Sequence, residues 1–348
     1  MSKLFVCGTY YHTLITLIKE LEAGEVCDLV LWNDIPEFKT LENNLEKTGV
    51  FHNIYIFDAV SYWKKVRPLS DIMFTLRGRH ITKKFMEDNL KINYSEYDDI
   101  YVYHDTHGPG QYFIMEGIRY HLIEDALDYF AYFDEYANIP LSTFQKQSLK
   151  TKIKKLLKIG FVCWGQSDAC IDIEVNDIKK IKINERKVIE APRQELFDKL
   201  TAQQKKIVYN TYTNGNELVN FVHTIKNKKV IILTQPLFKD EFVKDIKDQY
   251  RVYYCLTKEY ADQGYQVTIK PHPRDDMDYS SIIKEFDCVY VDKNIPSEIL
   301  NYDMNSCYEL AISITSTAIN FINTARIKRI YGREYIDVCL KNEKIKII

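Results

Sequence analysis

The sequence predicts two doubly wound α/β domains, each with a parallel sheet covered by helices on both faces. Three observations lead to this fold class. The chain has 348 residues, which suits two domains of ordinary size. Short apolar runs alternate with helical patterns in both halves of the chain. These runs are continuous rather than alternating, as strands buried on both faces require. We expect the two domains to face a central cleft.

The first half of the chain contains five predicted strands, joined by connections long enough for crossover helices. A helical pattern over residues 13–24 follows the first strand and ends at Gly24, a residue type that commonly terminates helices. Polar residues bound each apolar run and set the limits of the strands. The predicted strands are residues 3–7, 27–32, 53–57, 99–104 and 119–124.

The second half of the chain repeats this arrangement of strands and helices. A lysine-rich segment and a helical pattern at residues 193–212 separate the two halves. We place the domain boundary in this region, which gives domains of residues 1–185 and 186–348. The predicted strands of the second half are residues 229–235, 265–270, 288–292, 309–314 and 327–332.

The composition argues against several classes of function. A formal net charge of −2 gives no general attraction to nucleic acid, so we expect no nucleic-acid partner. The 8 cysteines form no C-x-x-C pair and lie mostly in apolar runs, which indicates a reducing compartment and no structural zinc. The N-terminus lacks a signal-peptide layout, and no apolar stretch is long enough to cross a bilayer. We therefore expect a cytoplasmic protein.

Polar clusters follow several predicted strands at their carboxyl ends, where doubly wound sheets bind their ligands. A carboxylate pair, Glu124 and Asp125, ends a strand of the first half. Hydroxyl, amide and imidazole groups end three strands of the second half, and a further carboxylate, Asp240, follows one of them. We expect these groups to converge on one cleft. The second-half groups are Thr234, Gln235, His272, Thr315, Ser316 and Thr317.

His272 is the sharpest candidate, because Pro271 and Pro273 flank it and Arg274 follows. The prolines restrict the backbone on both sides, so the direction of the imidazole is fixed before a ligand arrives. The other clusters also fit structural roles, since an acidic pair or a serine and threonine cluster can cap a helix. The same hydroxyls can instead bind a phosphate at a helix N-terminus.

Two further segments have more than one interpretation. Residues 103–113 contain His104 and His107, but their spacing is not specific for a metal, and a sugar-binding or structural loop fits better. Residues 146–160 place apolar residues on one helical face and lysines around the rest. This pattern fits a solvated linker helix. It also fits peripheral contact with the inner face of an anionic membrane, and both interpretations stay open.

Three of these segments together resemble the bacterial sialyltransferases of glycosyltransferase family 52, the lipooligosaccharide and capsule type. "HLIEDALDYF" is similar to the family's acidic segment, "IKPHPRDD" to its His-Pro segment and "ISITSTAINF" to its serine segment. The three segments are spread from residue 121 to residue 321, so the resemblance covers most of the chain. Ala126 stands where the family has glycine, and Asp240 matches a family aspartate only approximately.

The resemblance implies the GT-B fold, with an acceptor-side N-terminal domain and a C-terminal domain for the nucleotide sugar. It implies an inverting, metal-independent transfer of sialic acid from CMP-sialic acid to a galactose-type hydroxyl of a capsular or lipid-linked glycan. We expect no cofactor beyond the donor substrate, and the family suggests a homodimer. Some members transfer glucose, so another nucleotide sugar stays open.

This reaction assigns a role to each candidate residue. An acceptor hydroxyl needs a general base, for which Asp125 is the first choice and Asp240 the second. His272 can neutralise the charge that develops on the departing phosphate. The remaining residues are expected to bind the substrates. The donor-binding residues are Thr234, Gln235, Pro273, Arg274, Thr315, Ser316 and Thr317, and the acceptor-binding residues are Glu124, His104 and His107.

Other functions use a similar layout. A CDP-polyol phosphotransferase also places a His-Pro turn and a serine-rich turn against a CMP group. A carbohydrate-binding protein without activity would bind glycans in the absence of a nucleotide. A comparison of CMP-sialic acid, UDP-glucose and CDP-glycerol as donors separates these alternatives.

Overall fold

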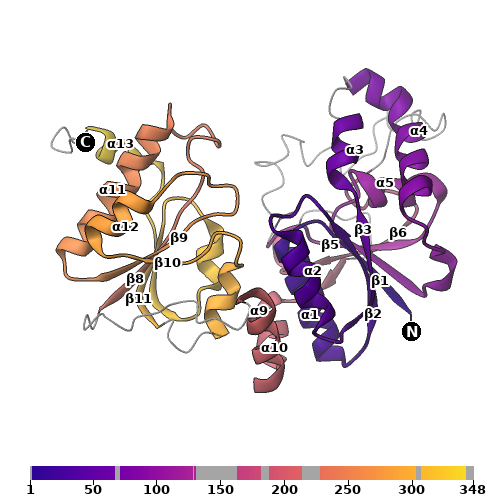
Figure 1. Ribbon diagram of the computed structural model, residues 1–348, viewed down its shortest axis with the longest axis horizontal. Helices are drawn as coiled ribbons and strands as arrows, with labels where there is room; N and C mark the ends of the chain where they lie inside the picture. The colour runs from indigo at the N-terminus through magenta and orange to yellow at the C-terminus, as the bar shows by residue number, and fades with distance from the viewer. Residues whose placement is uncertain are drawn as a thin grey trace. The chain divides into compact units, whose positions relative to one another are not determined.

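The computed structural model describes residues 2–66, 71–127, 129–130, 163–181, 188–213, 228–302 and 307–341. The chain forms two compact units, Met1–Ile207 and Val208–Ile348. Each unit contains one parallel sheet and the helices that connect its strands (Figure 1). The predicted fold of two doubly wound α/β domains is therefore confirmed. The predicted boundary between residues 185 and 186 lies outside the described residues.

The first unit contains a seven-stranded sheet in the order β3-β2-β1-β4-β5-β6-β7, and each neighbouring pair is parallel. The strand order changes direction between β1 and β4, and the carboxyl ends at such a point are where doubly wound sheets bind ligands. The strands are β1 Lys3–Cys7, β2 Cys27–Trp32, β3 Phe51–Phe57, β4 Asp99–Val102, β5 Tyr120–Ile123, β6 Cys170–Val175 and β7 Val188–Glu190.

The helices of the first unit begin and end at recognisable signals. Thr9 caps the first of them by accepting a hydrogen bond from the His12 backbone N–H, and Gly24 ends it in a left-handed conformation, as the sequence predicts. The described helices are α1 Tyr10–Ala23, α2 Phe38–Glu46, α3 Ala59–Val66, α4 Asp71–Asn89, α5 Gly108–Glu116 and α9 Arg193–Lys199, with the 3₁₀ turns η1 Tyr94–Glu96 and η2 Ile178–Lys180.

The second unit repeats the same plan with a five-stranded parallel sheet in the order β10-β9-β8-β11-β12. Its order changes direction between β8 and β11. Helices α11, α12 and α13 pack together on one face of this sheet (Figure 1). The elements are β8 Lys229–Leu233, α11 Ile246–Asp262, β9 Gln266–Lys270, α12 Ser280–Phe286, β10 Val289–Tyr290, η3 Ser297–Tyr302, β11 Tyr308–Ser313, η4 Thr317–Phe321, β12 Ala325–Ile330 and α13 Arg333–Lys341.

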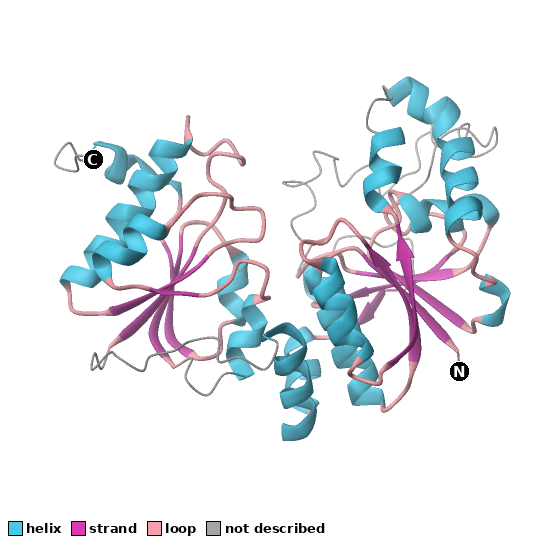
Figure 2. Cartoon of the chain, viewed as in Figure 1, coloured by secondary structure: helices cyan, strands magenta, loops and turns pink. Residues whose placement is uncertain are grey.

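The central strand β8 shows why its sequence is a continuous apolar run. Val230 and Ile232 belong to a buried cluster with α11, whereas Ile231 and Leu233 belong to a second buried cluster. Successive side chains of a strand point to opposite faces, so both faces of this sheet are covered. Figure 2 shows the strands of each unit with the helices packed beside them.

Each of the ten predicted strands overlaps a strand of the structure, and two further strands, β6 and β7, were not predicted. The predicted helix over residues 193–212 is two helices, α9 and α10 Ala202–Thr213. Thr201 separates them, because its hydroxyl accepts a hydrogen bond from the Gln204 N–H while the Gln204 side chain accepts one from the Thr201 N–H. This reciprocal capping box starts a new helix inside the periodic pattern.

No helix among the described residues is both long and apolar enough to cross a membrane. The lysine-rich segment 146–160, for which membrane contact was an open interpretation, lies outside the described residues.

Candidate functional site

The first unit gathers polar groups where its strand order changes direction. Gly8 and His12 follow β1, His104 follows β4, and Asp125 follows β5. These strands are neighbours in the sheet, so their carboxyl ends lie side by side. The sequence predicted Asp125 at this edge of the sheet and gave His104 as an acceptor-binding candidate, but it did not single out His12.

Asp125 is in direct contact with His12. The Nε2 atom of His12 lies 3.0 Å from the carboxylate Oδ1 of Asp125 and 3.0 Å from its backbone oxygen. The two side chains differ in exposure, because 33% of the Asp125 side chain is accessible and none of the His12 side chain is. A ligand can therefore reach the carboxylate, whereas the imidazole lies beneath it.

The surroundings of Asp125 favour its ionised form. Burial raises the pKa of this carboxyl, but the hydrogen bond from His12 acts against burial, and the pKa lies below its ordinary value. Tyr129 lies nearby, and burial together with the Asp125 charge raises the pKa of its hydroxyl to about 12. Asp125 is thus an accessible carboxylate that can accept a proton.

Glu124, which was expected to bind the acceptor, makes structural contacts instead. Its side chain is fully buried, and its two carboxylate oxygens accept hydrogen bonds from the backbone N–H groups of Phe130 and Asn176. These contacts tie the loop after β5 to the end of β6. The two adjacent carboxylates therefore have different surroundings, and only Asp125 is accessible.

His104 and His107 form an aromatic cluster with Trp32 and Trp63. The ring centroids of Trp32 and His104 are 5.0 Å apart, and those of Trp63 and His107 are 5.1 Å apart. Burial lowers the pKa of His104 to about 4 and also lowers the pKa of His107, so both rings are neutral at pH 7. Aromatic faces with a few polar groups are typical of sites for organic ligands.

Three nitrogens of this aromatic cluster are buried and have no hydrogen-bond partner within the described part of the chain. They are Nε1 of Trp32, Nδ1 of His104 and Nδ1 of His107. Buried polar atoms normally find a partner, so these nitrogens are candidates for contacts with a polar ligand. The acceptor-binding role expected of His104 and His107 stays a prediction, and Trp32 lies in the same cluster.

The second unit gathers its polar groups in the same way. Thr234 and Gln235 follow β8, His272 follows β9, and Thr315 and Ser316 follow β11. These three strands are neighbours in the sheet. The imidazole and hydroxyl groups therefore lie at neighbouring strand ends within this unit, and their convergence on one cleft stays a prediction.

His272 is held in one orientation by the turn that contains it. Its Nδ1 accepts a hydrogen bond of 3.0 Å from the Arg274 backbone N–H, so the ring hydrogen of the neutral imidazole lies on Nε2. Burial lowers the pKa of His272 to about 4, and the charges of Arg274 and Lys270 act in the same direction. At neutral pH His272 is therefore a neutral donor through its Nε2–H.

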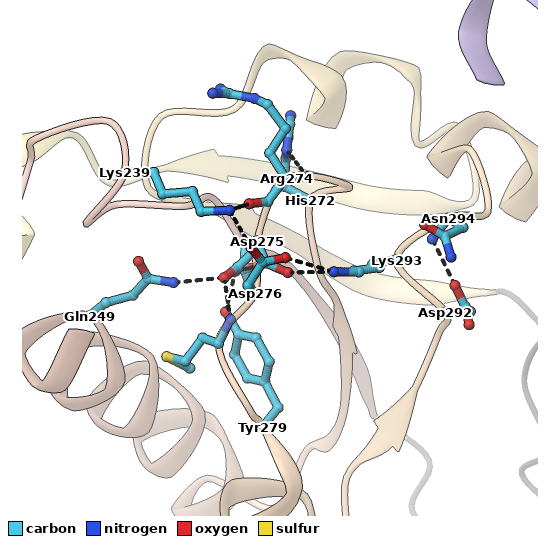
Figure 3. Close-up of polar contacts among 12 residues, drawn as sticks. Lys239, Gln249, His272, Arg274, Asp275, Asp276, Tyr279, Asp292, Lys293 and Asn294 are labelled. Carbon is cyan, nitrogen blue, oxygen red and sulfur yellow. Dashed lines mark hydrogen bonds and ion pairs between the residues drawn. The ribbon is translucent and has the colours of Figure 1, made fainter. Parts of the chain in front are cut away.

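The turn after His272 is fixed by Asp275, which is 2% exposed. Its carboxylate accepts hydrogen bonds from the Thr234 hydroxyl, the Gln249 amide and the Tyr279 hydroxyl, at 2.7, 2.8 and 2.7 Å. Figure 3 shows Asp275 with Gln249 and Tyr279 directed at it and Lys239 and Lys293 directed at neighbouring Asp276. Thr234, expected to bind the donor, thus supports the His272 turn.

Asp240, the second choice for a general base, is paired with Arg274. Its carboxylate oxygens lie 3.1 and 3.3 Å from the two terminal guanidinium nitrogens. The Asp240 side chain is 24% exposed and that of Arg274 is 62% exposed. Both residues therefore stand beside His272 in the second unit, and the Asp240 charge is balanced by a cation.

The remaining predicted donor residues lie around this turn. The Thr315 hydroxyl contacts the Gln235 side-chain oxygen, and the Gln235 backbone N–H donates to the Tyr253 hydroxyl at 2.6 Å. The Ser316 hydroxyl accepts a hydrogen bond from the Ala318 N–H and thereby caps η4. Pro273 is exposed, and Thr317 begins η4. The serine-rich turn therefore combines a capping role with a position next to Gln235.

Among the described residues, no group of three or more histidine, cysteine, aspartate or glutamate side chains has the arrangement of a metal site. The first unit has an accessible carboxylate, Asp125, and the second unit has a neutral imidazole, His272, next to the guanidinium of Arg274. Such groups can remove a proton from a hydroxyl and stabilise an anionic leaving group.

Sequence reasoning missed His12 and Trp32. His12 lies in "GTYYH", immediately after the first strand, so its position at a strand end was a signal. Trp32 closes the second predicted strand and is 4% exposed, which gave it the appearance of an ordinary core residue. Only the three-dimensional arrangement brings these two residues to Asp125 and His104.

A family model described as alpha-2,8-polysialyltransferase (POLYST) matches residues 80–327 of the chain. This range contains Asp125, His272 and Ser316. It supports the sialyltransferase class that the sequence predicted, whereas membership of glycosyltransferase family 52 stays a prediction. Comparison with curated protein sequences finds no match.

Solved structures of bacterial sialyltransferases are similar to this chain in fold. An alpha/beta-galactoside alpha-2,3-sialyltransferase from Photobacterium phosphoreum matches with a TM-score of 0.52 at 15% identity, over 94% of this chain and 90% of that chain. A sialyltransferase from Photobacterium damsela matches with a TM-score of 0.54 at 12% identity, over 94% of this chain and 73% of that chain. A structure of the GT-B domain of a Photobacterium damselae sialyltransferase has a TM-score of 0.51 at 10% identity, over 95% and 90% of the two chains. The chain therefore has the GT-B fold.

Proposed function

The chain belongs to the alpha-2,8-polysialyltransferase family, and from this premise we propose that it transfers sialic acid from CMP-sialic acid to a sugar hydroxyl. The observation that carries the proposal is the His272 turn, which presents a neutral Nε2–H beside an exposed guanidinium at the end of a central strand. A nucleoside monophosphate leaving group needs a hydrogen-bond donor and a positive charge at its phosphate.

The proposed reaction assigns one step to Asp125 and another to His272 with Arg274. Asp125 accepts the proton of the acceptor hydroxyl, whose oxygen attacks the anomeric carbon of the donor sugar. The bond from that carbon to the phosphate oxygen breaks, and CMP departs with the bonding electrons. The His272 Nε2–H donates a hydrogen bond to this oxygen, and Arg274 offsets its charge. A new glycosidic bond replaces the old one, with inversion at the anomeric carbon.

Asp125 is the better base because its partner is a histidine that leaves the carboxylate accessible. Asp240 is paired with the guanidinium of Arg274 and stands on the same side as the proposed leaving-group residue, His272. In an inverting transfer the base and the leaving group act on opposite faces of the donor sugar. The ion pair of Asp240 therefore supports a role in holding Arg274 until the donor binds.

No metal or cofactor takes part in the proposed reaction, since His272 and Arg274 provide the stabilisation of the phosphate. This part of the proposal predicts equal turnover with and without EDTA. Loss of turnover in EDTA and its return with magnesium or manganese would contradict it.

The family description supports a sialic-acid-terminated acceptor, joined through an alpha-2,8 linkage. A galactose-type acceptor, implied by the resemblance of the sequence segments, is the second candidate. The aromatic cluster of Trp32, Trp63, His104 and His107 is the proposed acceptor-binding surface for either sugar.

The experiment is a matrix of donors and acceptors. CMP-sialic acid, UDP-glucose and CDP-glycerol are each incubated with a sialic acid oligomer and with a galactoside, and the products are identified by mass spectrometry and linkage-specific sialidases. We expect transfer from CMP-sialic acid and from neither of the other donors. Transfer from UDP-glucose or CDP-glycerol instead, or glycan binding without transfer, would overturn the proposal.

A further inference from the structure

His12 is the buried group in closest contact with the proposed base, and we propose that it is a positioning residue for Asp125. Its imidazole determines which carboxylate oxygen receives the acceptor proton. This inference rests on the function proposed above. The proposal is based on two contacts of the His12 ring. The Gly8 backbone N–H donates a hydrogen bond to Nδ1 at 3.1 Å, and Nε2 lies 3.0 Å from Oδ1 of Asp125.

The first contact determines the tautomer of the ring. The Gly8 N–H is a donor, so Nδ1 of His12 must be an acceptor and carries no hydrogen. The hydrogen of the neutral ring therefore lies on Nε2, which faces Asp125. Nε2 lies 3.0 Å from both the backbone oxygen and the carboxylate Oδ1, so one N–H fixes the backbone and the side chain of Asp125 together.

The His12 ring itself cannot easily change direction. It is fully buried, and it stacks on Tyr103 with ring centroids 4.2 Å apart and ring planes 8° from parallel. The Tyr103 hydroxyl is in turn 2.9 Å from the Thr16 hydroxyl, one turn further along α1. Asp125 is therefore held by a ring whose orientation is fixed by α1 and by Tyr103, the residue that follows β4.

The consequence concerns the second carboxylate oxygen. Oδ1 of Asp125 is engaged by His12, and Oδ2 has no partner among the residues that the structure describes. The side chain is one-third exposed, so Oδ2 is the oxygen that a hydroxyl can reach. Holding a catalytic base in its productive geometry commonly changes rates by about 100-fold.

Two substitutions separate this positioning role from a general structural role. In His12→Gln, the amide nitrogen replaces Nε2 and can still donate to Asp125. In His12→Asn, the shorter side chain reaches only the Nδ1 position, so it can accept from Gly8 but cannot reach Asp125. We expect His12→Asn to lower kcat for transfer about 10- to 100-fold with little change in the KM for the donor, and His12→Gln to restore most of the loss.

His121 provides the matched control. It is also a largely buried histidine in contact with carboxylates, with Nδ1 2.8 Å from Asp172 and Nε2 3.3 Å from Asp99, but it stands in the body of the sheet rather than at its carboxyl edge. His121→Asn should therefore leave kcat unchanged. A loss of kcat in His121→Asn equal to that in His12→Asn would mean that removal of any buried imidazole lowers activity, and would overturn the proposal.

The pH dependence of kcat/KM provides a second test, because a purely structural role of His12 would leave the pKa of Asp125 unchanged. The titratable groups that face Asp125 are His12 from α1, His104 from the loop after β4 and Tyr129 from the loop that follows Asp125. Removing the His12 donor raises the pKa of Asp125, because this contact is what outweighs burial. The acid limb of kcat/KM should move to higher pH in His12→Asn and stay in place in His12→Gln and His121→Asn.

A double variant tests whether His12 acts through Asp125. If it does, Asp125→Asn combined with His12→Asn should transfer no more slowly than Asp125→Asn alone. A further loss as large as that of His12→Asn alone would overturn the proposal. Should the His12 variants fail to fold, ¹⁵N NMR of the wild-type histidines gives a direct answer: the His12 ring must show hydrogen on Nε2, and hydrogen on Nδ1 would overturn it.

The same experiments distinguish failure of this inference from failure of the proposed function. If wild-type protein transfers no sialic acid, or if Asp125→Asn transfers at the wild-type rate, the proposed function or its base is wrong. If wild type is active and Asp125→Asn is not, equal activity of wild type and His12→Asn overturns only the role of His12.

Discussion

The two histidines that matter most for this chemistry, His12 and His272, have the same hydrogen-bond arrangement. A backbone N–H occupies Nδ1 in each ring, from Gly8 in the case of His12 and from Arg274 in the case of His272. Each ring therefore presents its hydrogen on Nε2, toward Asp125 in the first unit and toward the proposed phosphate in the second. The backbone thus selects the tautomer without a carboxylate behind the ring.

His272 is expected to act as a neutral hydrogen-bond donor. Replacing it by alanine should lower turnover about 10²- to 10⁴-fold, because the leaving phosphate loses its donor. The measurement is kcat at saturating CMP-sialic acid, with circular dichroism as a check on folding. His52→Ala is the control, since that histidine is 76% exposed and should leave turnover unchanged. Near wild-type turnover in His272→Ala would refute the assignment.

The choice of base is tested by two near-isosteric substitutions. Asp125→Asn should lower transfer by about 10²- to 10⁴-fold while CMP binding, measured by calorimetry, stays normal. Asp240→Asn removes only the partner of Arg274, so transfer should continue. If Asp240→Asn abolishes transfer and Asp125→Asn does not, the carboxylate beside Arg274 is the base.

The sequence located this site better in the second unit than in the first. His272 could be predicted because prolines on both sides make its role visible in the linear sequence. His12, Trp32 and Asp125 come from three separate strand ends, and no local pattern joins them. Glu124 and Asp125 are adjacent and chemically alike, so only burial separates the structural carboxylate from the accessible one.

At the scale of secondary-structure elements, helix α5 controls the position of the loop that carries His104. Gly110 lies in its first turn, and a Cβ there would come within 2.5 Å of the His104 backbone oxygen and 2.7 Å of the Asp105 Cα. Both neighbours are backbone atoms that cannot rotate away. This close approach explains why the first turn of α5 has glycine at this position.

Gly110→Ala therefore sets two effects against each other. Alanine favours a helix by about 1 kcal/mol over glycine, whereas overpacking of this kind costs about 1–3 kcal/mol. We expect the second effect to win, with a lower free energy of unfolding in urea and lower transfer activity as His104 shifts. Gly117→Ala at the end of the same helix separates packing from backbone strain, because a Cβ there meets nothing within 4 Å but Gly117 has a φ of +70°. It should lower stability without shifting His104, and should therefore leave transfer activity unchanged. Greater stability of Gly110→Ala than of wild type would contradict the packing argument.

The elements that the sequence did not predict have physical reasons for their weak signals. β7 is only three residues long and lies at the edge of its sheet, so it needs no continuous apolar run. β6, "CIDIEV", contains Asp172 and Glu174, which contact His121 and Arg193. Paired charges of this kind break an apolar run without breaking the strand.

At the scale of the whole molecule, stability should depend on pH through its neutral histidines. His104 and His272 have a pKa of about 4 in the folded protein and an ordinary value of 6.5. Between these values the unfolded chain binds more protons than the folded one, so acidification favours unfolding. The contribution of these two histidines to the free energy of unfolding is fully present above about pH 6.5 and is lost as the pH falls toward 4.

The measurement is the Tm between pH 8 and pH 4. We expect a nearly constant Tm above pH 7 and a steady fall from about 6.5 downward. The double variant His104→Gln and His272→Gln should have a shallower fall, because neither glutamine binds a proton in this range. A variant with the same slope as wild type would show that these histidines do not cause the pH dependence.

The architecture of the whole chain could be predicted because it depends on repeated local signals. Continuous apolar runs reveal strands buried on both faces, and their spacing reveals the crossover helices. The strand orders of the two sheets have no such local signal, and neither has the unit boundary, which follows residue 207 inside the helical segment α10. These features depend on which strands pair, and pairing is decided by contacts between distant parts of the chain.

The anchoring of Asp275 has a consequence for motion. Amide hydrogens in surface turns usually exchange with water rapidly, since such turns open by local fluctuation. The turn after β9 is different, because both of its amides are hydrogen-bonded. The Asp275 N–H donates to the His272 backbone oxygen at 2.8 Å, and the Met277 N–H donates to the Asp275 carboxylate at 3.1 Å. The side chains of Thr234, Gln249 and Tyr279 donate to the same carboxylate.

These two amides should therefore exchange as slowly as the central strands, at a rate set by unfolding of the whole second unit. Adding CMP should barely change their protection, because the turn is already ordered before the nucleotide arrives. Binding a nucleotide to such a turn involves little loss of backbone entropy at this position. Rapid exchange at Met277 that becomes slow only with CMP would instead indicate a turn that folds around its ligand.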